Sequence, residues 1–306
     1  MVQRRSDVLI LSCVAILLLF GLVMLGSASA NLGMNKTGDG YFFLKHQLLY
    51  GFIPGIIGLL VASKIYYGIY ERWAIGIFIV AIGLLLLLFT PLGTSTGGAL
   101  RWLTIGPISF QPAEVVKMGV IIYLAAWLAG VKERQQSTIK GLLPFLAILG
   151  ILGVTLLKQS STSFFALIFA VACIMYFASG ARGTYLVGIF LIGALGFSIV
   201  SYATPYRWAR IMTYINPNAN IETQGYHINQ ALNAIGSGGI AGVGLGESTT
   251  KIKYLPEPMT DSIFAIIGEE LGFIGGSAVL LLLGILVIRI LLLASQTTSR
   301  FGHLLL

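Results

Sequence analysis

The residues best suited to chemistry in this sequence are ionisable side chains that lie inside apolar segments. A charge near the middle of a bilayer costs about 2.5–3.5 kcal/mol even on insertion scales, so such groups are functional candidates by default. Four acids and two bases fit this description: Glu114, Lys117, Asp261, Glu269, Glu270 and Arg289, the last of which can reach the membrane interface and is assigned no function. Each of them also has a structural alternative that the sequence leaves open.

Glu114 and Lys117 are three residues apart on one expected helix, where their side chains can neutralise each other as an ion pair. Glu269 and Glu270 follow Asp261 by eight and nine residues, which places them about 12 Å further along the helix axis. Carboxylates buried at that depth require partners. A structural role is therefore favoured over a catalytic one for both glutamates.

Asp261 opens the last apolar segment, directly after the proline-containing residues 255–260. The chain changes there from an extended stretch to a helix, and Asp is a good N-cap whose charge the helix dipole stabilises. From position alone, capping is the favoured interpretation. The alternative is a carboxylate that takes part in acid–base chemistry.

Two further motifs have both a plain and a chemical interpretation. Residues 236–246 contain six glycines, but the absence of a preceding strand and of a Gly-Lys-Ser/Thr ending argues against a nucleotide-binding loop. They form either a tight turn or a place where backbone N–H groups approach phosphate or sugar oxygens. Arg101 and Trp102 precede the fourth apolar segment, where such a pair is typical of an anchor at the membrane interface.

The elements that must position these residues follow from the composition. Of 306 residues, 57% are hydrophobic and 10% are charged, whereas a soluble domain carries about 25% charged residues. Apolar runs of about 17–20 residues can span a bilayer, so we expect an all-α, polytopic membrane protein with eight transmembrane helices. The expected spans are residues 8–26, 47–63, 73–90, 113–130, 141–157, 161–179, 184–203 and 262–294.

The distribution of charge predicts sidedness. The formal net charge is +8, but the basic residues are scattered between apolar runs, so membrane topology explains them better than nucleic-acid binding does. They are densest in the connections that face the cytoplasm if the N-terminus is cytoplasmic. The first span follows Arg4 and Arg5 and resembles a signal peptide, but its length favours an uncleaved anchor. Residues 204–260 then form one large extracytoplasmic loop, in which apolar residues between 228 and 235 recur at helical spacing.

We expect a single integral membrane domain over residues 1–306. Residues 300–306 resemble the beginning of a ninth apolar span, so we expect the chain to be C-terminally truncated. The two cysteines, Cys13 and Cys173, lie within apolar runs and support neither a disulfide framework nor a metal site.

Three long motifs resemble those of the SEDS family (shape, elongation, division and sporulation; FtsW, RodA and SpoVE), whose members are peptidoglycan glycosyltransferases. They are RWLTIGPISFQPAE at 101–114, QALNAIGSGG with GVGLG at 230–246, and YLPEPMTD with GEELGFIG at 254–275. The resemblance covers essentially the whole chain and is strongest to the FtsW branch. The chain departs from the family pattern at Leu100, Met259, Ser262 and residues 159–163. It also has eight expected spans where the family has about ten, which leaves the activity of this length of chain open.

The resemblance implies an inverting glycosyltransferase that polymerises lipid II in cell division, on the outer face of the cytoplasmic membrane. The 4-hydroxyl of the acceptor N-acetylglucosamine attacks the anomeric carbon of the donor N-acetylmuramic acid, and undecaprenyl pyrophosphate leaves. This reaction needs a base for the hydroxyl and positive charge for the pyrophosphate. Asp261 is the expected catalytic base, and Glu269 and Glu270 are expected to support the site. The expected substrate-binding residues are Arg101, Glu114, Lys117, Arg207, Arg210, Lys251 and Lys253.

The partners implied by the resemblance are lipid II, a class B penicillin-binding protein transpeptidase and other membrane proteins of the division machinery, with no nucleic acid. A divalent cation is compatible with the chemistry, although no cluster of ligands in the sequence identifies a metal site. The alternatives are a RodA-like elongation polymerase, a lipid II flippase and a non-catalytic division scaffold. A flippase predicts related halves with a charged path near the midplane, whereas the sequence has no internal repeat and its motifs lie on the expected outer side.

Overall fold

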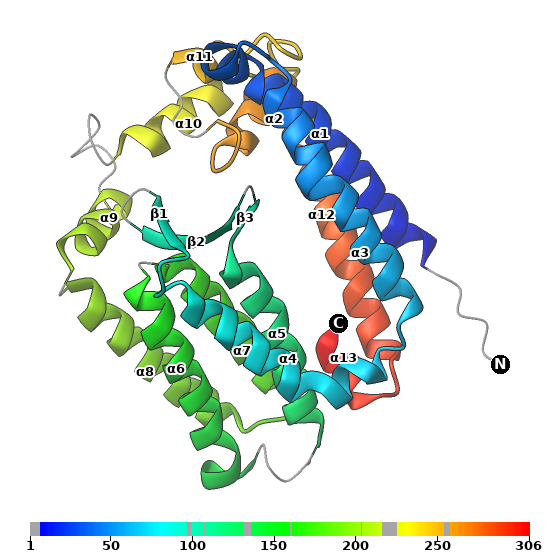
Figure 1. Ribbon diagram of the computed structural model, residues 1–306, viewed down its shortest axis with the longest axis vertical. Coiled ribbons are helices and arrows are strands. Elements are labelled where there is room, and N and C mark those ends of the chain that lie inside the picture. The colour runs from blue at the N-terminus through cyan, green and yellow to red at the C-terminus, as the bar shows by residue number, and fades with distance from the viewer. Residues whose placement is uncertain are drawn as a thin grey trace. The chain divides into compact units, whose positions relative to one another are not determined.

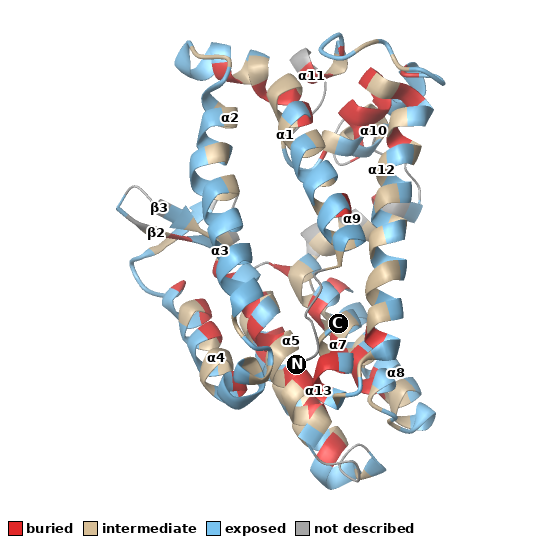
Figure 2. Ribbon diagram, turned by 90° about the vertical axis from the view of Figure 1, so that its right-hand side faces the viewer, coloured by how far each residue is buried: buried red, intermediate tan, exposed pale blue. Residues whose placement is uncertain are grey.

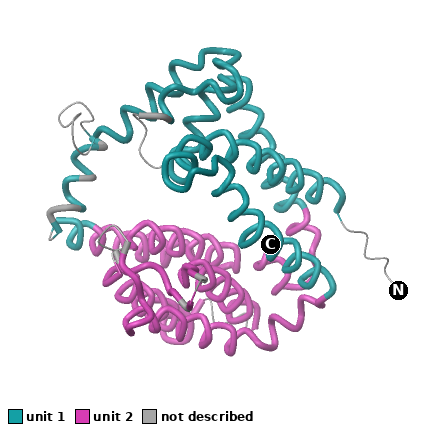
Figure 3. Tube along the Cα trace, turned by 45° about the horizontal axis from the view of Figure 1, so that its top comes forward, with its two compact units in different colours: residues 1–64, 198–292 teal, residues 65–197, 293–306 magenta. Residues whose placement is uncertain are grey.

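The computed structural model describes residues 7–96, 99–106, 108–130, 136–159, 161–202, 204–215, 225–253 and 258–306. The chain divides into two compact units (Figure 3). Unit 1 contains residues 1–64 and 198–292, and unit 2 contains residues 65–197 and 293–306. A single domain over the whole chain therefore stays a prediction.

Unit 1 is built from helices (Figure 1). Its membrane-length helices are α1 (Val8–Thr37), the continuous run of α2 (Phe42–Gln47), the π-helical turn η1 (Leu48–Phe52) and α3 (Ile53–Lys64), and α12 (Ile263–Gln296). The segment expected as one large loop contains three shorter helices: α9 (Pro205–Ile215), α10 (Tyr226–Ser237) and α11 (Thr250–Lys253). Helix α10 confirms the helical spacing between residues 228 and 235.

Helices α1 and α12 run antiparallel and are joined near the N-terminus of α1. There, Asp7 accepts a hydrogen bond from the Ile10 N–H (3.2 Å) and forms an ion pair with Arg289 of α12 (2.7 Å). The Arg289 guanidinium beside Asp7 holds the pKa of that carboxyl below its usual range. Further along α1, Met24 and Ala28 are buried in a cluster with α10 and the first turns of α12.

Helix α12 is interrupted at Gly272, whose φ of 64° and ψ of −162° are not helical. A break inside a membrane helix frees backbone groups that must find partners within the protein. The glycine-rich segment supplies them on one side of the break. The N–H groups of Val243 and Gly244 donate to the carbonyl oxygens of Glu269 and Glu270, each over 3.0 Å.

The same segment accepts hydrogen bonds from the other side of the break. The Phe273 N–H donates to the Gly239 carbonyl (2.9 Å), and the Ile274 N–H donates to the Ile240 carbonyl (3.2 Å). A Cβ atom at Gly242 would overlap the backbone of α12, so the close approach requires glycine there. The segment is therefore a tight turn that supplies hydrogen-bond partners to the interrupted helix. Its N–H groups that donate to α12 are not available to bind a phosphate.

Unit 2 combines a helical core with a small antiparallel sheet. Its helices are α4 (Gly68–Leu87), α5 (Pro112–Gly130), the π-helical turn η3 (Thr138–Leu142) with α6 (Leu143–Lys158), α7 (Thr162–Ala178), α8 (Gly183–Tyr202, whose last turn belongs to unit 1) and α13 (Arg300–Leu305). Its strands, in the order β1-β2-β3, are β1 (Gly93–Thr96), β2 (Ala99–Ile105) and β3 (Ile108–Phe110). Fully buried side chains such as Val116, Leu152 and Tyr176 form its core, part of which is coloured red in Figure 2.

The helical class expected from the sequence is confirmed. Within the described residues, seven helices are long and apolar enough to cross a membrane, and they match seven of the eight expected spans. The eighth, residues 161–179, corresponds to α7, an apolar helix of 17 residues, so the count of eight stays a prediction. The sheet was not expected from the sequence. The chain is a multi-pass membrane protein.

Candidate functional site

Asp261 lies in the turn that precedes α12, and it is exposed. Helix α12 begins at Ile263, and the Ser262 carbonyl accepts the first hydrogen bonds, from the N–H groups of Ala265 (3.0 Å) and Ile266 (3.3 Å). Ser262 therefore occupies the N-cap position, so the structure does not support capping by Asp261. Within the described residues, the Asp261 carboxylate has no hydrogen-bond or ion-pair partner, which leaves its oxygens open to accept a proton.

A histidine that the sequence analysis did not single out lies beside this turn. Nε2 of His227, on α10, is 3.3 Å from the Ser262 hydroxyl oxygen. The two residues are 35 positions apart, and no spacing in the sequence connects them. Ser262 is also one of the residues at which the sequence analysis noted a departure from the family pattern. The contact places an imidazole next to the residue that follows Asp261.

Glu270 is fully buried and forms an ion pair with Lys251. The Lys251 ammonium lies 2.6 Å from the Glu270 carboxylate, and the exposed fraction of the two side chains is 3% and 0%. Lys251 also donates to the Gly246 carbonyl (2.8 Å) and the Ser27 hydroxyl (3.1 Å), while Ser27 donates to Glu270 (2.7 Å). A buried pair is tolerated when good geometry and further hydrogen bonds compensate for lost hydration. This cluster meets that condition and joins α1, α11 with the segment before it, and α12.

Glu269 is buried next to it but uses neutral partners. Its carboxylate accepts hydrogen bonds from the Ser248 hydroxyl (2.6 Å), from the Thr249 and Thr250 N–H groups (3.1 and 3.3 Å), and from the Thr250 hydroxyl. Several donors to one carboxylate stabilise its charged form without a cation. Both glutamates therefore have the partners that burial requires, and their expected role in supporting the site stays a prediction.

Residues 248–251 are attached to α12 through Glu269 and Glu270. Lys251, expected to contact substrate, is instead buried and neutralised by Glu270. Direct contact with a pyrophosphate would require this ion pair to open.

The other expected binding residues lie in separate places. In unit 2, Glu114 and Lys117 form the ion pair that their spacing predicted (2.7 Å), and the Lys117 ammonium also lies 5.1 Å from the centre of the Phe164 ring. Arg101 is exposed on β2. The structure therefore pairs Glu114 with Lys117 and Glu270 with Lys251, in two units, and no single unit contains all the expected residues.

The remaining three cations belong to unit 1. Arg207 lies on α9, where its Nη1 is 3.5 Å from the Thr204 hydroxyl oxygen. The side chains of Arg210 and Lys253 lie outside the described part of the structure. Their substrate-binding roles stay predictions.

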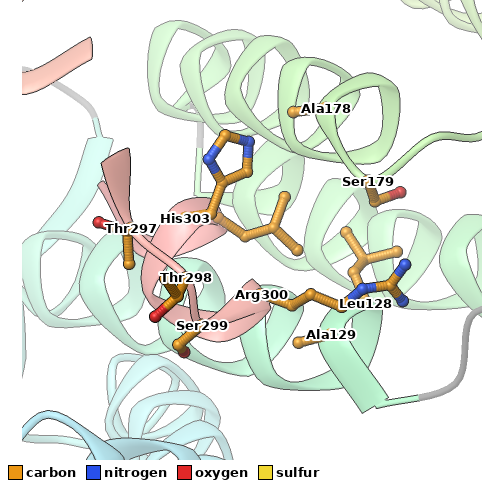
Figure 4. A pocket seen from close by; sticks show the side chains of 10 residues that line it. Leu128, Ala129, Ala178, Ser179, Thr297, Thr298, Ser299, Arg300 and His303 are labelled. Carbon is orange, nitrogen blue, oxygen red and sulfur yellow. The ribbon is translucent and has the colours of Figure 1, made fainter. Parts of the chain in front are cut away.

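Unit 2 contains a cavity of about 200 Å³. Figure 4 shows it between Leu128 of α5, Ser179 after α7, and His303 of α13. None of the expected site residues lines it, and its lining residues include no carboxylate. In the described ranges, no group of three or more His, Cys, Asp or Glu side chains could hold a metal ion. Among the expected site residues, Asp261, whose carboxylate is unpaired in the described part of the chain, is therefore the candidate reactive group.

The sequence matches one family along nearly its whole length. The family model for FtsW, RodA and SpoVE, described as cell cycle protein, matches residues 7–306. The probable peptidoglycan glycosyltransferase FtsW of Geobacter sp. (strain M18) is 36% identical over 300 residues, which cover 98% of this chain and 82% of that protein. Stage V sporulation protein E of Bacillus subtilis (strain 168) is 36% identical over 301 residues, with coverage of 98% and 82%.

Solved structures share the fold. A chain from a peptidoglycan synthase complex that coordinates polymerization and crosslinking is similar with a TM-score of 0.76 and 24% identity, covering 99% of this chain and 82% of that one. The rod shape determining protein RodA of Thermus thermophilus has a TM-score of 0.66 and 23% identity, covering 99% and 80%. Because both identities are below 25%, these similarities show that the fold is shared.

Proposed function

We propose that this chain, which belongs to the FtsW/RodA/SpoVE family, is a membrane-embedded peptidoglycan glycosyltransferase. Its substrate is lipid II, a disaccharide peptide linked to undecaprenyl pyrophosphate, and its product is a glycan strand. Relatives that carry the name of peptidoglycan glycosyltransferase FtsW at 36% identity support this function. They also favour the division branch over RodA-like elongation.

In the proposed reaction, Asp261 accepts the proton of the acceptor 4-hydroxyl as that oxygen attacks the anomeric carbon of the donor. A new C–O bond forms with inversion, and the bond to the pyrophosphate breaks with its electron pair leaving on undecaprenyl pyrophosphate. A positioned base accelerates such a step by about 100-fold to 10,000-fold. Arg207, which belongs to the same unit as Asp261, is the proposed cation for the leaving group, because positive charge there stabilises the transition state. The substrate-binding roles of Arg101 and Lys117 in unit 2 stay predictions.

The observation that carries this assignment is the contrast between four acids. Within the described structure, Glu114, Glu269 and Glu270 each have an ion pair or several hydrogen bonds, whereas Asp261 has neither. A general base needs a carboxylate that can accept a proton at the reaction site, and a carboxylate already saturated by donors is a poor one. Asp261 is thus the acid of this set best suited to be the base.

The proposed setting is the outer face of the cytoplasmic membrane, with the N-terminus in the cytoplasm and residues 204–260 outside. The charge distribution supports this orientation. The proposed partner is a class B penicillin-binding protein, because glycan strands need a transpeptidase to cross-link them. The fold similarity to a chain of a peptidoglycan synthase complex is compatible with such a partner.

Purified lipid II and proteoliposomes test the function directly. The full-length protein, reconstituted with its transpeptidase, should convert lipid II into glycan strands that a gel resolves as a ladder. A flippase would move lipid II across the bilayer without lengthening it, and a scaffold would do neither. Transport without polymer, or no change in lipid II at all, would contradict the proposal.

A further inference from the structure

The cavity of about 200 Å³ in unit 2 lies where several helices begin or end. Leu128 belongs to the last turn of α5, Ser179 is the C-cap of α7, and Ser299 is the N-cap of α13. Helix α5 is long and apolar enough to cross a membrane, so its end lies near the boundary between hydrocarbon and water. We therefore expect the cavity at the level of the lipid head groups.

The ionisable side chains that line the cavity are both basic. They are Arg300 and His303, and the lining includes no carboxylate. Arg300 is exposed, and its guanidinium has no hydrogen-bond or ion-pair partner within the described residues. A guanidinium presents five N–H donors in a planar arrangement that matches the oxygens of a phosphate. The cavity therefore favours an anion.

The hydroxyl groups of the cavity divide into two kinds. Those of Ser179 and Thr297 donate to backbone carbonyls (2.7 and 2.8 Å), so their protons are already used. The Ser299 hydroxyl accepts the N–H that it caps (3.1 Å) and keeps its own proton, and the Thr298 hydroxyl has no partner in the described part of the chain. The donors still available are the Arg300 guanidinium and two hydroxyls, a set suited to phosphate oxygens.

His303 is held by a backbone contact. Its Nδ1 lies 2.8 Å from the carbonyl oxygen of Ala294, and because a carbonyl oxygen only accepts, Nδ1 carries the proton. Among the described residues, Nε2 has no partner. In the imidazolium form this second nitrogen also becomes a donor, so His303 can add to the positive charge that Arg300 provides.

The size of the cavity and the rest of its lining indicate what carries the anion. Its volume is below the range of about 300–1,000 Å³ for sites that enclose a drug-sized ligand, so it suits a head group better than a whole molecule. Its other lining residues are apolar: Leu128, Ala129, Ala178 and Leu304. An inorganic phosphate would gain nothing from them, whereas a phospholipid brings carbon atoms next to its phosphate.

We propose that this cavity binds the phosphate head group of an anionic phospholipid, with Arg300 as its main ligand. Basic pockets between membrane helices on the cytoplasmic side are typical sites for such lipids. The charge distribution predicts that this end of unit 2 is cytoplasmic. The inference is independent of the proposed function, because it concerns binding alone and gives the lipid no part in polymerisation.

Two exposed arginines give a matched pair of variants. Arg300→Gln removes the charge that lines the cavity. Arg182→Gln removes an equal charge three residues after Ser179, at a position that does not line the cavity. In the described structure neither side chain has a partner to lose, so both variants should fold. Ala178→Leu supplies a third variant, which fills part of the cavity and leaves every charge in place.

Native mass spectrometry of the purified protein in detergent can count bound lipid. The wild type should retain phosphatidylglycerol in preference to phosphatidylcholine with the same acyl chains. Arg300→Gln should bind phosphatidylglycerol at least about tenfold more weakly, because hydrogen bonds to a charged group are lost. Ala178→Leu should also lose most of the bound lipid, whereas Arg182→Gln should match the wild type.

Three results would overturn the proposal. Equal losses for Arg300→Gln and Arg182→Gln would show a general attraction between a basic surface and anionic lipid. Undiminished binding by Ala178→Leu would show that the lipid does not enter the cavity. Inorganic phosphate that displaces the lipid at equal concentration would show that the cavity recognises a free anion, whereas retention of the lipid in excess phosphate supports a lipid site.

Discussion

Asp261 and the pair Glu269–Glu270 belong to the same short stretch of chain, but their surroundings are opposite. Asp261 is exposed and, in the described structure, unpartnered. Glu269 and Glu270 are 1% and 0% exposed and are saturated by hydroxyl, N–H and ammonium donors. The difference separates two uses of acidic residues near the start of one membrane helix. The buried pair connects segments distant in sequence, and the exposed acid is the one that we propose as the base.

The largest loss of stability is expected when the charge of Glu270 is removed, which tests whether the buried pair has a structural role. Glu270→Gln keeps the shape of the side chain but leaves the Lys251 ammonium buried without a counter-ion. Breaking a buried pair from one side typically costs about 3–5 kcal/mol of stability. We expect a large fall in the thermal unfolding temperature in detergent, together with loss of activity through unfolding. A variant as stable as the wild type would show that the ion pair does not hold the loop to α12.

Removing both charges sharpens this test. The double variant Lys251→Met with Glu270→Met leaves no uncompensated charge, and replacing a buried pair by apolar residues is often close to neutral. It should recover most of the stability that either single change loses. A double variant whose loss equals the sum of the two single losses would contradict direct coupling between the side chains.

Variants of the glycine-rich segment that packs against the helix break at Gly272 should lose less stability than Glu270→Gln. Gly242 has a φ of 84° and no space for a Cβ, whereas Gly239 has a φ of 56° with no atom within 4 Å of an added Cβ. Ala at either position should cost about 1–2 kcal/mol for its left-handed backbone, and Gly242→Ala should cost more because α12 must also shift. Equal unfolding temperatures for the two variants would show that the segment does not pack against the break.

The sequence was sufficient for the features that depend on local spacing. Apolar runs predicted the membrane helices, because a span needs about 20 apolar residues wherever it lies. The three-residue spacing of Glu114 and Lys117 predicted an ion pair, and helical periodicity predicted α10. Each of these inferences needs only residues close together in the chain.

The sequence was not sufficient where distant segments meet. Nothing near Glu270 indicates that its partner is Lys251, 19 residues earlier, or that Ser27, 243 residues away, completes the cluster. The identity of the N-cap also depends on where α12 begins, and Asp and Ser are both good caps. Helix α12 begins one residue later than the sequence suggested, so Ser262 and not Asp261 occupies the N-cap position.

The contact between Ser262 and His227 predicts a smaller loss of stability than the glycine variants. Ser262→Ala removes a cap hydroxyl and the 3.3 Å contact with the imidazole, which should lower stability by about 1 kcal/mol. Polymerisation should remain within a few-fold of the wild type if His227 only packs there. A large fall in rate at unchanged stability would instead give His227 a part in positioning Asp261.

The most direct test of the central claim is the polymerisation rate of Asp261→Asn per folded molecule. Asn keeps the size of Asp but cannot accept a proton at neutral pH, and the native carboxylate has no partner to lose in the described structure. We expect an unfolding temperature near that of the wild type and a rate lower by about 100-fold to 10,000-fold. A near-normal rate of glycan synthesis at matched protein abundance would contradict the assignment of Asp261 as the base.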